Sequence, residues 1–230
     1  MNKQSIRKLL QRFPFFKNLT EYEIDPIVDL AKHRLYRNGS HVFMQGDQLT
    51  NVYFIHQGQV KIYKTDLHGK EQIVNILQPG DMFPHQGFFR QDDYPAHAEA
   101  LGDIVLIYIP IQSFEDFLIA HPEICVKLFR VLGDIIVDLQ NRLEEKILYN
   151  TFEQIIMLLL RLIKSHGEAL DEDKYIIKTQ FTNRELANMI GSSRETVSRT
   201  LTKLKNNQCI ETDPTGLLIV YPEVLKKQMF

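Results

Sequence analysis

The stretch FTNRELANMIGSSRETVSRTLTKLKNNQCI constrains the local fold more strongly than any other part of the chain. Thr182 and Glu185 stand at capping-box spacing, and so do Ser192 and Glu195. Each pair can satisfy the unpaired amides at the start of a helix, so two helix starts are predicted about ten residues apart. Gly191 lies between them, where the first helix must end in a left-handed residue. The stretch therefore predicts two short helices around a tight turn, the outline of a helix-turn-helix.

The second predicted helix has an apolar and a polar face when its residues are placed at ~100° per position. Val197, Leu201 and Leu204 fall on one side and are predicted to pack against the first helix. Arginine can donate two hydrogen bonds to guanine O6 and N7, and glutamate can accept one from cytosine N4. The other side, an arc of roughly 140°, therefore predicts base contacts in DNA, from Arg194, Glu195, Ser198, Arg199 and Thr202.

Three neighbouring positions complete the predicted DNA-contacting set, namely Thr182, Ser193 and Lys203. The alternative is an ordinary helical hairpin with a charged, solvated outer face. The capping boxes, the glycine turn and the arginines on the outward N-terminal turn favour binding to double-stranded DNA. For Glu195, a role as helix cap and a role in base contact both stay open.

Charge is distributed unevenly along the chain. The formal net charge is -2 and the pI is about 6.4, which argues against a protein that coats nucleic acid. Residues 178–207 nevertheless hold six basic and two acidic side chains, a net +4, so the rest of the chain carries -6. A basic face on an acidic body is suited to contacting phosphates at a specific site.

Length and composition are those of a globular protein. The 230 residues allow two compact domains, and the chain is 44% hydrophobic and 24% charged. No run approaches the ~18 uncharged apolar residues that span a bilayer. Residues 1–16 lack an uninterrupted apolar core and a small-residue cleavage site, so no signal peptide is predicted. We expect a cytoplasmic protein without a membrane partner.

The two cysteines, Cys125 and Cys209, lie far apart among apolar neighbours. No CxxC or Cys/His ligand spacing occurs, so the sequence predicts neither a structural zinc nor a cysteine-ligated iron–sulfur cluster. Both cysteines are interpreted as buried thiols. A redox role for either stays open, because it would require an exposed thiol of low pKa.

Residues 38–110 are predicted to be all-β. Glycine-containing turns interrupt this segment, and the short runs between them are rich in β-branched and aromatic residues: VYFIH, QVKIYKT, EQIVNIL and IVLIYIP. Such spacing is typical of a sandwich or a small antiparallel barrel. A barrel of this size can enclose one small ligand.

A long helix is predicted over residues 121–148, because Pro122 suits a first helical position and apolar residues recur at spacings of three and four. At ~1.5 Å per residue the helix would be about 40 Å long. Its apolar surface is too broad for one neighbour, so one side is predicted to pack on the barrel and another on a symmetric copy. The predicted dimer contacts are Leu128, Val131, Leu132, Ile135, Leu139 and Leu143. The alternative is a helix buried within one monomer.

The C-terminal segment is predicted to begin with a hinge at Tyr149 and Asn150, where Asn150 can cap a new helix. Residues 168–174 are interpreted as a charged loop. After the two motif helices, residues 209–211 and 217–221 flank a TDPTG turn and predict a β-hairpin. That hairpin would make the C-terminal unit a winged helix-turn-helix.

A β-barrel, a long helix and a C-terminal winged helix-turn-helix, in that order, resemble the CRP/FNR family of bacterial transcription regulators. The resemblance is most specific in IGSSRETVSRTLTKL, while VYFIHQGQVKIY, DLHGKEQIV and LQPGDMF match the family's strands and glycine turns. It implies an α+β fold whose effector-sensing domain, residues 1–120, is a cyclic-nucleotide-binding-like jelly-roll barrel with N-terminal helices. Residues 121–148 would form the dimerisation helix and residues 149–230 the winged helix-turn-helix domain.

Carried over by position, Arg194, Glu195 and Arg199 match the residues that read bases in the cyclic-AMP receptor branch. The resemblance implies a two-fold symmetric site with TGTGA-like half-sites, and RNA polymerase as a partner. Ser198 is more similar to the FNR branch, which leaves the outer bases of the half-site open.

The resemblance does not identify an effector. The cyclic-AMP branch binds the phosphate through a Gly-Glu pair and then an Arg-Ser or Arg-Thr pair. Here the corresponding segments are GDMFPHQGFF and YPAHA, with no arginine where a cyclic phosphate needs a bidentate partner. Cyclic AMP is therefore not expected. The N-terminal cysteine cluster of FNR is also missing, so an iron–sulfur cluster is not expected either.

Haem stays open as a cofactor. His85-Gln86-Gly87 resembles the His-x-Gly stretch that supplies a haem ligand in carbon-monoxide-sensing relatives, and imidazole is a suitable axial ligand. The alternative is that His85 is an ordinary loop or pocket residue. The predicted effector pocket comprises Phe83, His85, Gln86, Gly87 and His97.

The leading functional hypothesis is a homodimeric, sequence-specific regulator of transcription whose barrel receives a signal. A regulator of the same fold that needs no effector is one alternative. Another is a ligand-sensing module of an enzyme or channel, against which the C-terminal motif argues. The sequence has no Gly-rich phosphate loop, paired catalytic carboxylates or nucleophile motif, so no enzyme is predicted.

Overall fold

The computed structural model describes residues 3–11, 13, 16, 19–85 and 92–229. The chain divides into two compact units, Met1–Val137 and Asp138–Phe230. The division falls within the long helix α4 (Pro122–Leu148), whose bounds confirm the helix predicted there. Among the described residues, no helix combines the length and the apolar character that crossing a membrane requires.

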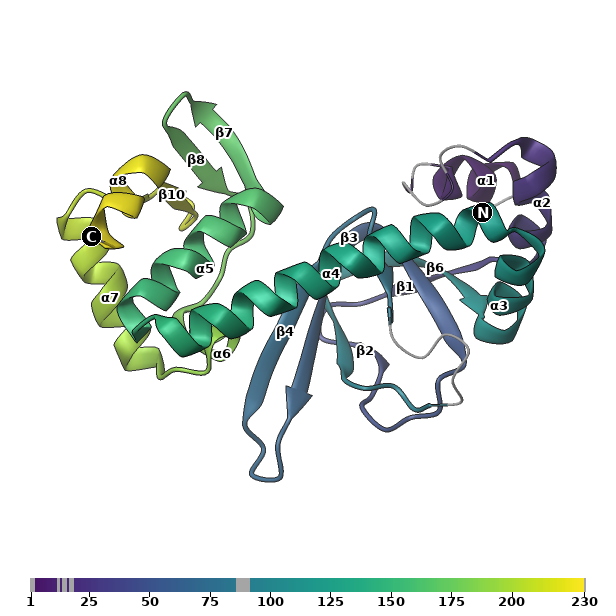
Figure 1. Ribbon diagram of the computed structural model, residues 1–230, viewed down its shortest axis with the longest axis horizontal. Helices are drawn as coiled ribbons and strands as arrows, with labels where there is room; N and C mark the ends of the chain where they lie inside the picture. The colour runs from purple at the N-terminus through teal and green to yellow at the C-terminus, as the bar shows by residue number, and fades with distance from the viewer. Residues whose placement is uncertain (1–2, 12, 14–15, 17–18, 86–91, 230) are drawn as a thin grey trace. The chain divides into compact units, whose positions relative to one another are not determined.

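An antiparallel sheet forms the N-terminal unit (Figure 1). The hydrogen-bonded order is β1-β6-β3-β4, with β2 on β6 and β5 on β3, which confirms the predicted jelly-roll type of fold. Among the described residues no pairing joins β1 to β4, so the sheet is rolled without closing into a complete barrel. The strands are β1 (Lys32–Tyr36), β2 (His41–Phe43), β3 (Asn51–Thr65), β4 (Glu71–Leu77), β5 (Met82–Phe83) and β6 (His97–Pro110).

The two longest strands approach each other closely at Gly58, in the middle of β3. Its φ is +82°, and a Cβ there would lie 2.6 Å from Ile104 Cγ2 and 2.9 Å from the Asp103 carbonyl oxygen. Only glycine fits this left-handed position against β6. The glycine therefore lets β3 bend while it stays paired with β6.

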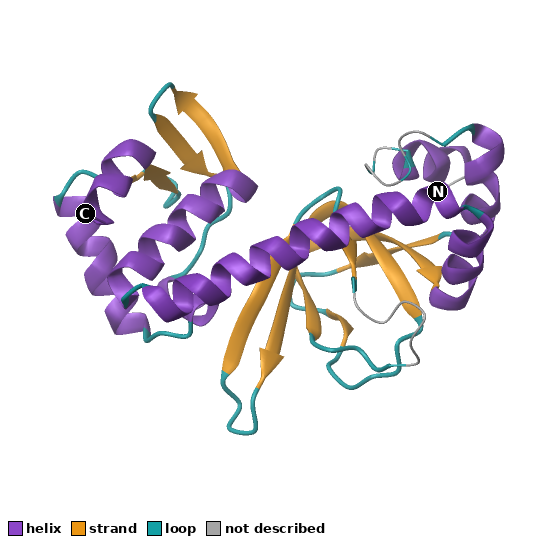
Figure 2. Cartoon of the chain, in the orientation of Figure 1, coloured by secondary structure: helices purple, strands orange, loops and turns teal. Residues whose placement is uncertain are grey.

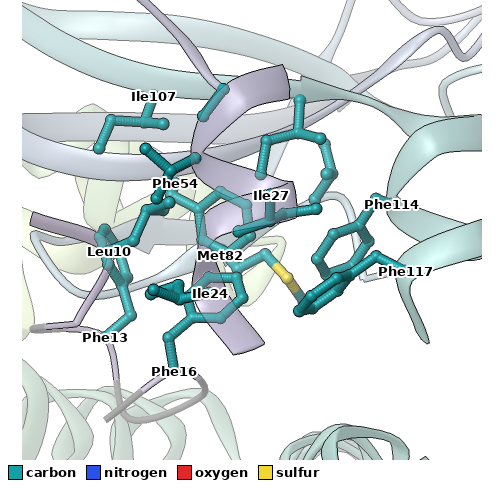
Figure 3. Close-up of a cluster of buried hydrophobic side chains, with 14 of the residues drawn as sticks. Leu10, Phe13, Phe16, Ile24, Ile27, Phe54, Met82, Ile107, Phe114 and Phe117 are labelled. Atoms are coloured by element: carbon teal, nitrogen blue, oxygen red, sulfur yellow. The ribbon is translucent and has the colours of Figure 1, made fainter. Parts of the chain in front are cut away.

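Helices cover one end of this sheet, where α1 (Lys3–Leu10), α2 (Glu21–Leu30) and α3 (Ile111–Ala120) gather (Figure 1). Thr20 starts α2 with a complete capping box. Phenylalanines from the N-terminal segment and α3 surround Phe54 of β3 (Figure 3): the Phe13, Phe16 and Phe114 rings lie 5.3, 5.3 and 5.9 Å from it. This cluster joins the helices to the sheet in one core.

The C-terminal unit is a winged helix-turn-helix, as the sequence predicts. Its sheet has the order β7-β8-β10-β9, and its core lies among α5, α6 and α7. The segment predicted as a charged loop instead pairs with β8 as a strand, and the β7–β8 hairpin projects from the end of α5 (Figure 2). The elements are α5 (Thr151–His166), β7 (Gly167–Asp171), β8 (Lys174–Ile177), α6 (Asn183–Ile190), α7 (Arg194–Asn206), β9 (Ile210–Thr212), β10 (Leu218–Val220), α8 (Pro222–Lys226) and a 3₁₀ turn (Lys227–Met229).

Candidate nucleic-acid interface

The turn between α6 and α7 has the predicted geometry. Thr182 and Glu185 form a complete capping box at the start of α6, in which Thr182 N–H donates to the Glu185 carboxylate at 2.7 Å. Gly191 ends the helix in the left-handed region, at φ 65°. The N–H groups of Gly191 and Ser192 both point back to the carbonyl oxygen of Ala187. The tight turn is therefore fixed by backbone hydrogen bonds.

The second helix begins one residue later than the sequence predicts. Ser193, not Ser192, is the N-cap of α7, and its side chain accepts a hydrogen bond from Thr196 N–H at 3.1 Å. Since Ser192 N–H is used by the turn of α6, the predicted Ser192–Glu195 capping box is wrong. Glu195 is left exposed on the first turn, where hydrogen bonds to its own backbone and to Ser193, and the charges of Arg194 and Arg199, lower its pKa.

The two faces of α7 are arranged as predicted. Val197, Leu201 and Leu204 are buried in the core of the unit. Arginines at positions 194 and 199, together with Glu195, are exposed, while Ser198 is half-buried between them. The outward N-terminal part of the helix thus presents two fork-shaped donors and one ionised acceptor.

The remaining predicted contact residues already have partners within the unit. Thr182 and Ser193 serve as helix caps, and the Thr202 hydroxyl donates to the Ser198 carbonyl oxygen at 2.9 Å. The Lys203 ammonium lies 4.4 Å from the centre of the Phe152 ring on α5. All four residues are exposed, so they stay candidate contacts for phosphates beside the base-reading side chains.

This arrangement has the chemistry of DNA recognition. The N-terminal turns of α7 carry the side chains that can reach base edges in a major groove, and exposed helix N-termini favour phosphate. The hairpin β9–β10 forms the wing. Its turn is held by Asp213, whose carboxylate accepts from Leu217 N–H at 2.7 Å and from Thr215 N–H at 3.0 Å.

Aromatic rings fill the inner side of the N-terminal sheet. The rings of Phe43 and Tyr94 are stacked with centroids 3.7 Å apart, and those of Tyr53 and Phe83 are stacked at 5.3 Å. Phe43 also contacts Tyr53 and Phe83, at 5.7 and 5.9 Å. All four side chains are buried. Phe83, a predicted pocket residue, is therefore part of a packed core.

His97, another predicted pocket residue, lies on the other side of the sheet from this cluster. In the β3–β6 register Ile62 is opposite Ala98, and Tyr63 is opposite His97. Ile62 and Ala98 pack with the aromatic cluster. Since side chains alternate between the two faces of a strand, Tyr63 and His97 face the opposite way. The prediction that His97 and Phe83 line one pocket is wrong.

The surroundings of His97 are those of a polar surface cluster. Its ring stacks on Tyr63 at 4.8 Å, and its Nδ1 accepts a hydrogen bond from Gln45 N–H at 3.2 Å. Burial, and then the neighbouring His41, lower the pKa of His97. The imidazole of His97 thus already accepts a hydrogen bond from the loop that follows β2.

His85 has a neutral imidazole. It is half-buried, and burial lowers its pKa to about 4. Gln86 and Gly87 lie outside the described residues. A neutral imidazole is suited to be an axial haem ligand, so His85 stays a candidate ligand. His97 lies on the other side of the sheet and is not part of this candidate site.

The described side chains on the inner side of the sheet are aromatic and apolar. Residues 94–98 provide tyrosine, proline, alanine, histidine and alanine, and none of these can hold a cyclic phosphate as arginine does. The stacked rings of Phe43 and Tyr94 also occupy part of this side. Among the described residues 94–98, none therefore supplies the bidentate cation that a cyclic phosphate needs, and the absence of cyclic AMP stays a prediction.

An apolar stripe on α4 is open to solvent. Leu128 is only 5% exposed, because it packs into the core of its own unit, whereas the adjacent Phe129 is 70% exposed. Ile136 and Leu143, each seven residues further along, are 55% and 63% exposed. Of the other predicted contacts, Leu139 is exposed, while Val131, Leu132 and Ile135 are half-buried. The open stripe therefore includes Phe129 and Ile136, which are not among the predicted dimer contacts, whereas Leu128 lies outside it.

The two cysteines are buried to different degrees. Cys209 is fully buried, and burial raises the pKa of its thiol. Cys125 is half-buried and its Sγ donates to the Leu118 carbonyl oxygen at 3.3 Å. Within the part of the chain that the structure describes, no group of three or more His, Cys, Asp or Glu side chains could hold a metal ion.

His166, at the end of α5, is a buried base. It is 6% exposed, its Nδ1 lies 2.7 Å from the Ser165 hydroxyl, and its ring packs edge-on against Phe181. Its Nε2 has no hydrogen-bond partner among the described residues. Burial lowers the pKa of His166 to about 4.

This buried base predicts acid sensitivity. The unfolded chain binds a proton at His166 near pH 6.5, whereas the folded chain does so only near pH 4. Folding is therefore stabilised above pH 6.5, and about 2 kcal/mol of that stability is lost between pH 7 and pH 5. Urea unfolding of His166→Leu should lack this part of the pH dependence, while the exposed-histidine control His68→Leu should keep it. Equal pH profiles for wild type and His166→Leu would contradict the prediction.

Comparisons with known proteins agree with both units. A family model described as a cyclic nucleotide-binding domain matches residues 33–121, and one described as a Crp-like helix-turn-helix domain matches residues 153–228. The cyclic AMP receptor protein of Thermus thermophilus is 26% identical over 201 residues, covering 87% of this chain and 89% of that protein. The CRP-like cAMP-activated global transcriptional regulator of Mycobacterium tuberculosis is 24% identical over 221 residues, 96% of this chain and 98% of that protein.

A solved structure agrees with the fold. The structure of a CooA mutant from Carboxydothermus hydrogenoformans matches with a TM-score of 0.77 and 20% identity, over 96% of this chain and 95% of that one. At this identity the match shows a shared fold.

Proposed function

Because this chain belongs to the CRP/FNR family of DNA-binding transcription regulators, we propose that it acts as a homodimer on a palindromic, TGTGA-like DNA site. The observation that carries the proposal is the outward face of α7. Arg194, Glu195 and Arg199 are exposed there on the first turns of the helix, with their apolar neighbours in the core. Arginine forks and an ionised glutamate are the groups that read guanine and cytosine.

Dimerisation is supported by the open apolar stripe on α4. A two-fold symmetric site requires two recognition helices about one DNA turn apart, ~34 Å. Phe129, Ile136 and Leu143 repeat every seven residues, with Leu132 and Leu139 between them, which is the pattern of a coiled-coil seam. Two copies of α4 joined along this seam would bring two DNA-binding units into one assembly.

We further propose that the protein binds DNA without a cyclic nucleotide. The stacked rings on the inner side of the sheet and the lack of arginine in residues 94–98 support this form of the function. A signal at the N-terminal unit, including haem at His85, is compatible with it. The proposed setting is the cytoplasm, with RNA polymerase as the protein partner and no catalytic activity of its own.

The test is DNA binding by purified, ligand-free protein. Fluorescence anisotropy would compare a duplex carrying an inverted TGTGA repeat with one of equal composition and scrambled half-sites. We expect the inverted repeat to bind at least about 10³-fold more tightly at physiological salt. We also expect the dissociation constant to stay unchanged when millimolar cyclic AMP is added.

Different results would contradict the two parts of the proposal, which are recognition of the inverted repeat and DNA binding without cyclic AMP. Equal affinity for both duplexes, with and without cyclic AMP, would contradict sequence-specific recognition of this site. Preference for the repeat that develops only after cyclic AMP is added would retain the DNA-binding function and contradict the ligand-free form.

A further inference from the structure

Polar side chains tie the C-terminal end of α4 to the helix-turn-helix. Residues 138–148 belong to the same unit as α5, α6 and α7. The side chains involved are Glu145 and Lys146 on α4 and Gln154 and Arg161 on α5, and we call these four residues the brace. The contacts within the brace are a helix cap, hydrogen bonds at the corner between α4 and α5, and an ion pair.

Lys146 reaches the turn of the helix-turn-helix. Its Nζ donates hydrogen bonds to the Ile190 carbonyl oxygen at 2.9 Å and to Gln154 Oε1 at 3.3 Å. Ile190 is the last residue of α6, and the last four carbonyl groups of a helix have no partner within it. A cation is also favoured at this negative end of the helix dipole. Lys146 therefore caps α6 from another helix.

The side chain of Gln154 forms hydrogen bonds with Tyr149, at the corner between α4 and α5, and with Lys146 on α4. It is buried in the first turn of α5, its Nε2 donates to the Tyr149 carbonyl oxygen at 2.7 Å, and its Oε1 accepts from Lys146. Asn150 caps α5 in a complete capping box with Glu153. The two residues of the corner are thus fixed by side-chain and backbone hydrogen bonds together.

Glu145 and Arg161 form the third contact. The carboxylate of Glu145 is buried and pairs with the guanidinium of Arg161, about two turns along α5 from Gln154. The buried carboxylate of Glu145 would be costly without the half-buried guanidinium of Arg161, so the pair resists separation. This pair holds the last turns of α4 alongside α5.

We infer that the brace joins residues 138–148 and the helix-turn-helix into one rigid body, and that Lys146 is a positioning residue for the recognition helix α7. The inference deepens the proposed function and rests on it, because it concerns how the dimer helix aims α7 at its half-site. The corner at Tyr149 and Asn150, which the sequence alone predicts as a hinge, is then fixed. A rotation of α4 reaches the α6–α7 turn directly through Lys146.

The test measures how strictly the dimer requires one half-site spacing. The substitution Lys146→Met removes the ammonium and keeps an apolar stem, and Lys146→Arg restores a donor. The matched control is Lys164→Met, which removes one positive charge from an exposed position on α5. Dissociation constants would be measured for the inverted repeat, for the same repeat lengthened by a few base pairs, and for an isolated half-site.

We expect Lys146→Met to lower the preference for the correct spacing about tenfold, because α7 is no longer aimed by α4. Its affinity for the isolated half-site should match that of Lys164→Met, since α7 itself is intact. Lys146→Arg and Lys164→Met should keep the wild-type spacing preference. A spacing preference in Lys146→Met within about twofold of the wild type would overturn the inference.

Hydrogen exchange provides an independent measurement. The amides of Gly191 and Ser192 should exchange faster in Lys146→Met than in Lys164→Met, because the turn has lost its cap. If Lys146→Met does not fold, Gln154→Met loosens the brace from α5 and receives the same comparison. Wild-type protein that prefers no inverted repeat would contradict the proposed function, whereas unchanged exchange at the turn would contradict the brace.

Discussion

Replacing Arg199 with alanine is expected to weaken binding to the inverted repeat by between about 30-fold and about 10⁴-fold. A bidentate arginine–guanine contact is worth ~1–3 kcal/mol, and a dimer makes two of them. Arg199 is exposed on the outward face of α7, so its removal leaves the core of the unit intact. The same anisotropy measurement, repeated with each guanine of the half-site replaced, should show that preference is lost at one position.

Two further substitutions separate base reading from charge. Arg199→Lys keeps the positive charge and loses the fork, so it should lose the guanine preference while the salt dependence of binding is retained. Arg37→Ala is the control, since Arg37 is an exposed arginine of the N-terminal unit paired with Asp103 at 2.6 Å. Arg37→Ala should bind as the wild type does. Unchanged affinity and specificity in Arg199→Ala would contradict the proposal that Arg199 on α7 contacts the bases of the site.

The second large effect concerns the apolar stripe of α4. The double substitution Ile136→Asp and Leu143→Asp would place carboxylates in the seam that we propose to join two copies. Burying an unpaired charge costs several kcal/mol, so the dissociation constant of the dimer should rise about a thousandfold or more. Sedimentation should then show a monomer where the wild type is a dimer.

The control for the seam is Asn141→Asp, which adds one carboxylate two residues from Leu143 at an exposed position off the heptad seam. It should remain dimeric and bind the inverted repeat as the wild type does. The double variant should bind an isolated half-site as the wild type does and lose its preference for the full repeat. A double variant that stays dimeric would place the interface elsewhere on the molecule.

The helix-turn-helix could be read from the sequence because its determinants are local. The capping box of Thr182 and Glu185 spans three residues, the left-handed end at Gly191 is one residue, and the faces of α7 repeat within two turns. The start of α7 was misplaced by one residue because the turn of α6 takes up the Ser192 N–H, and a spacing rule does not include that competition. The strand β7 was missed because its formation depends on pairing with β8.

The strands and turns of the N-terminal unit could be predicted from the sequence, but the set of residues that share one face of its sheet could not. Whether position 97 faces the inside depends on the register between β3 and β6, whose paired residues Tyr63 and His97 lie far apart in the chain. The stacking of Phe43 on Tyr94 joins separate segments in the same way. The predicted pocket, taken from the segments that the family resemblance aligns, therefore combined Phe83 and His97 from opposite faces.

By itself the sequence determined the order of the elements, the two helices of the DNA-binding motif and the residues on their outward face, since periodicity and capping act over a few residues. Tertiary structure alone decided that Leu128 belongs to its own core, that aromatic rings occupy the inner side of the sheet, and that Lys146 caps α6. These facts depend on contacts between distant segments, because burial and hydrogen-bond partners are properties of the packed chain.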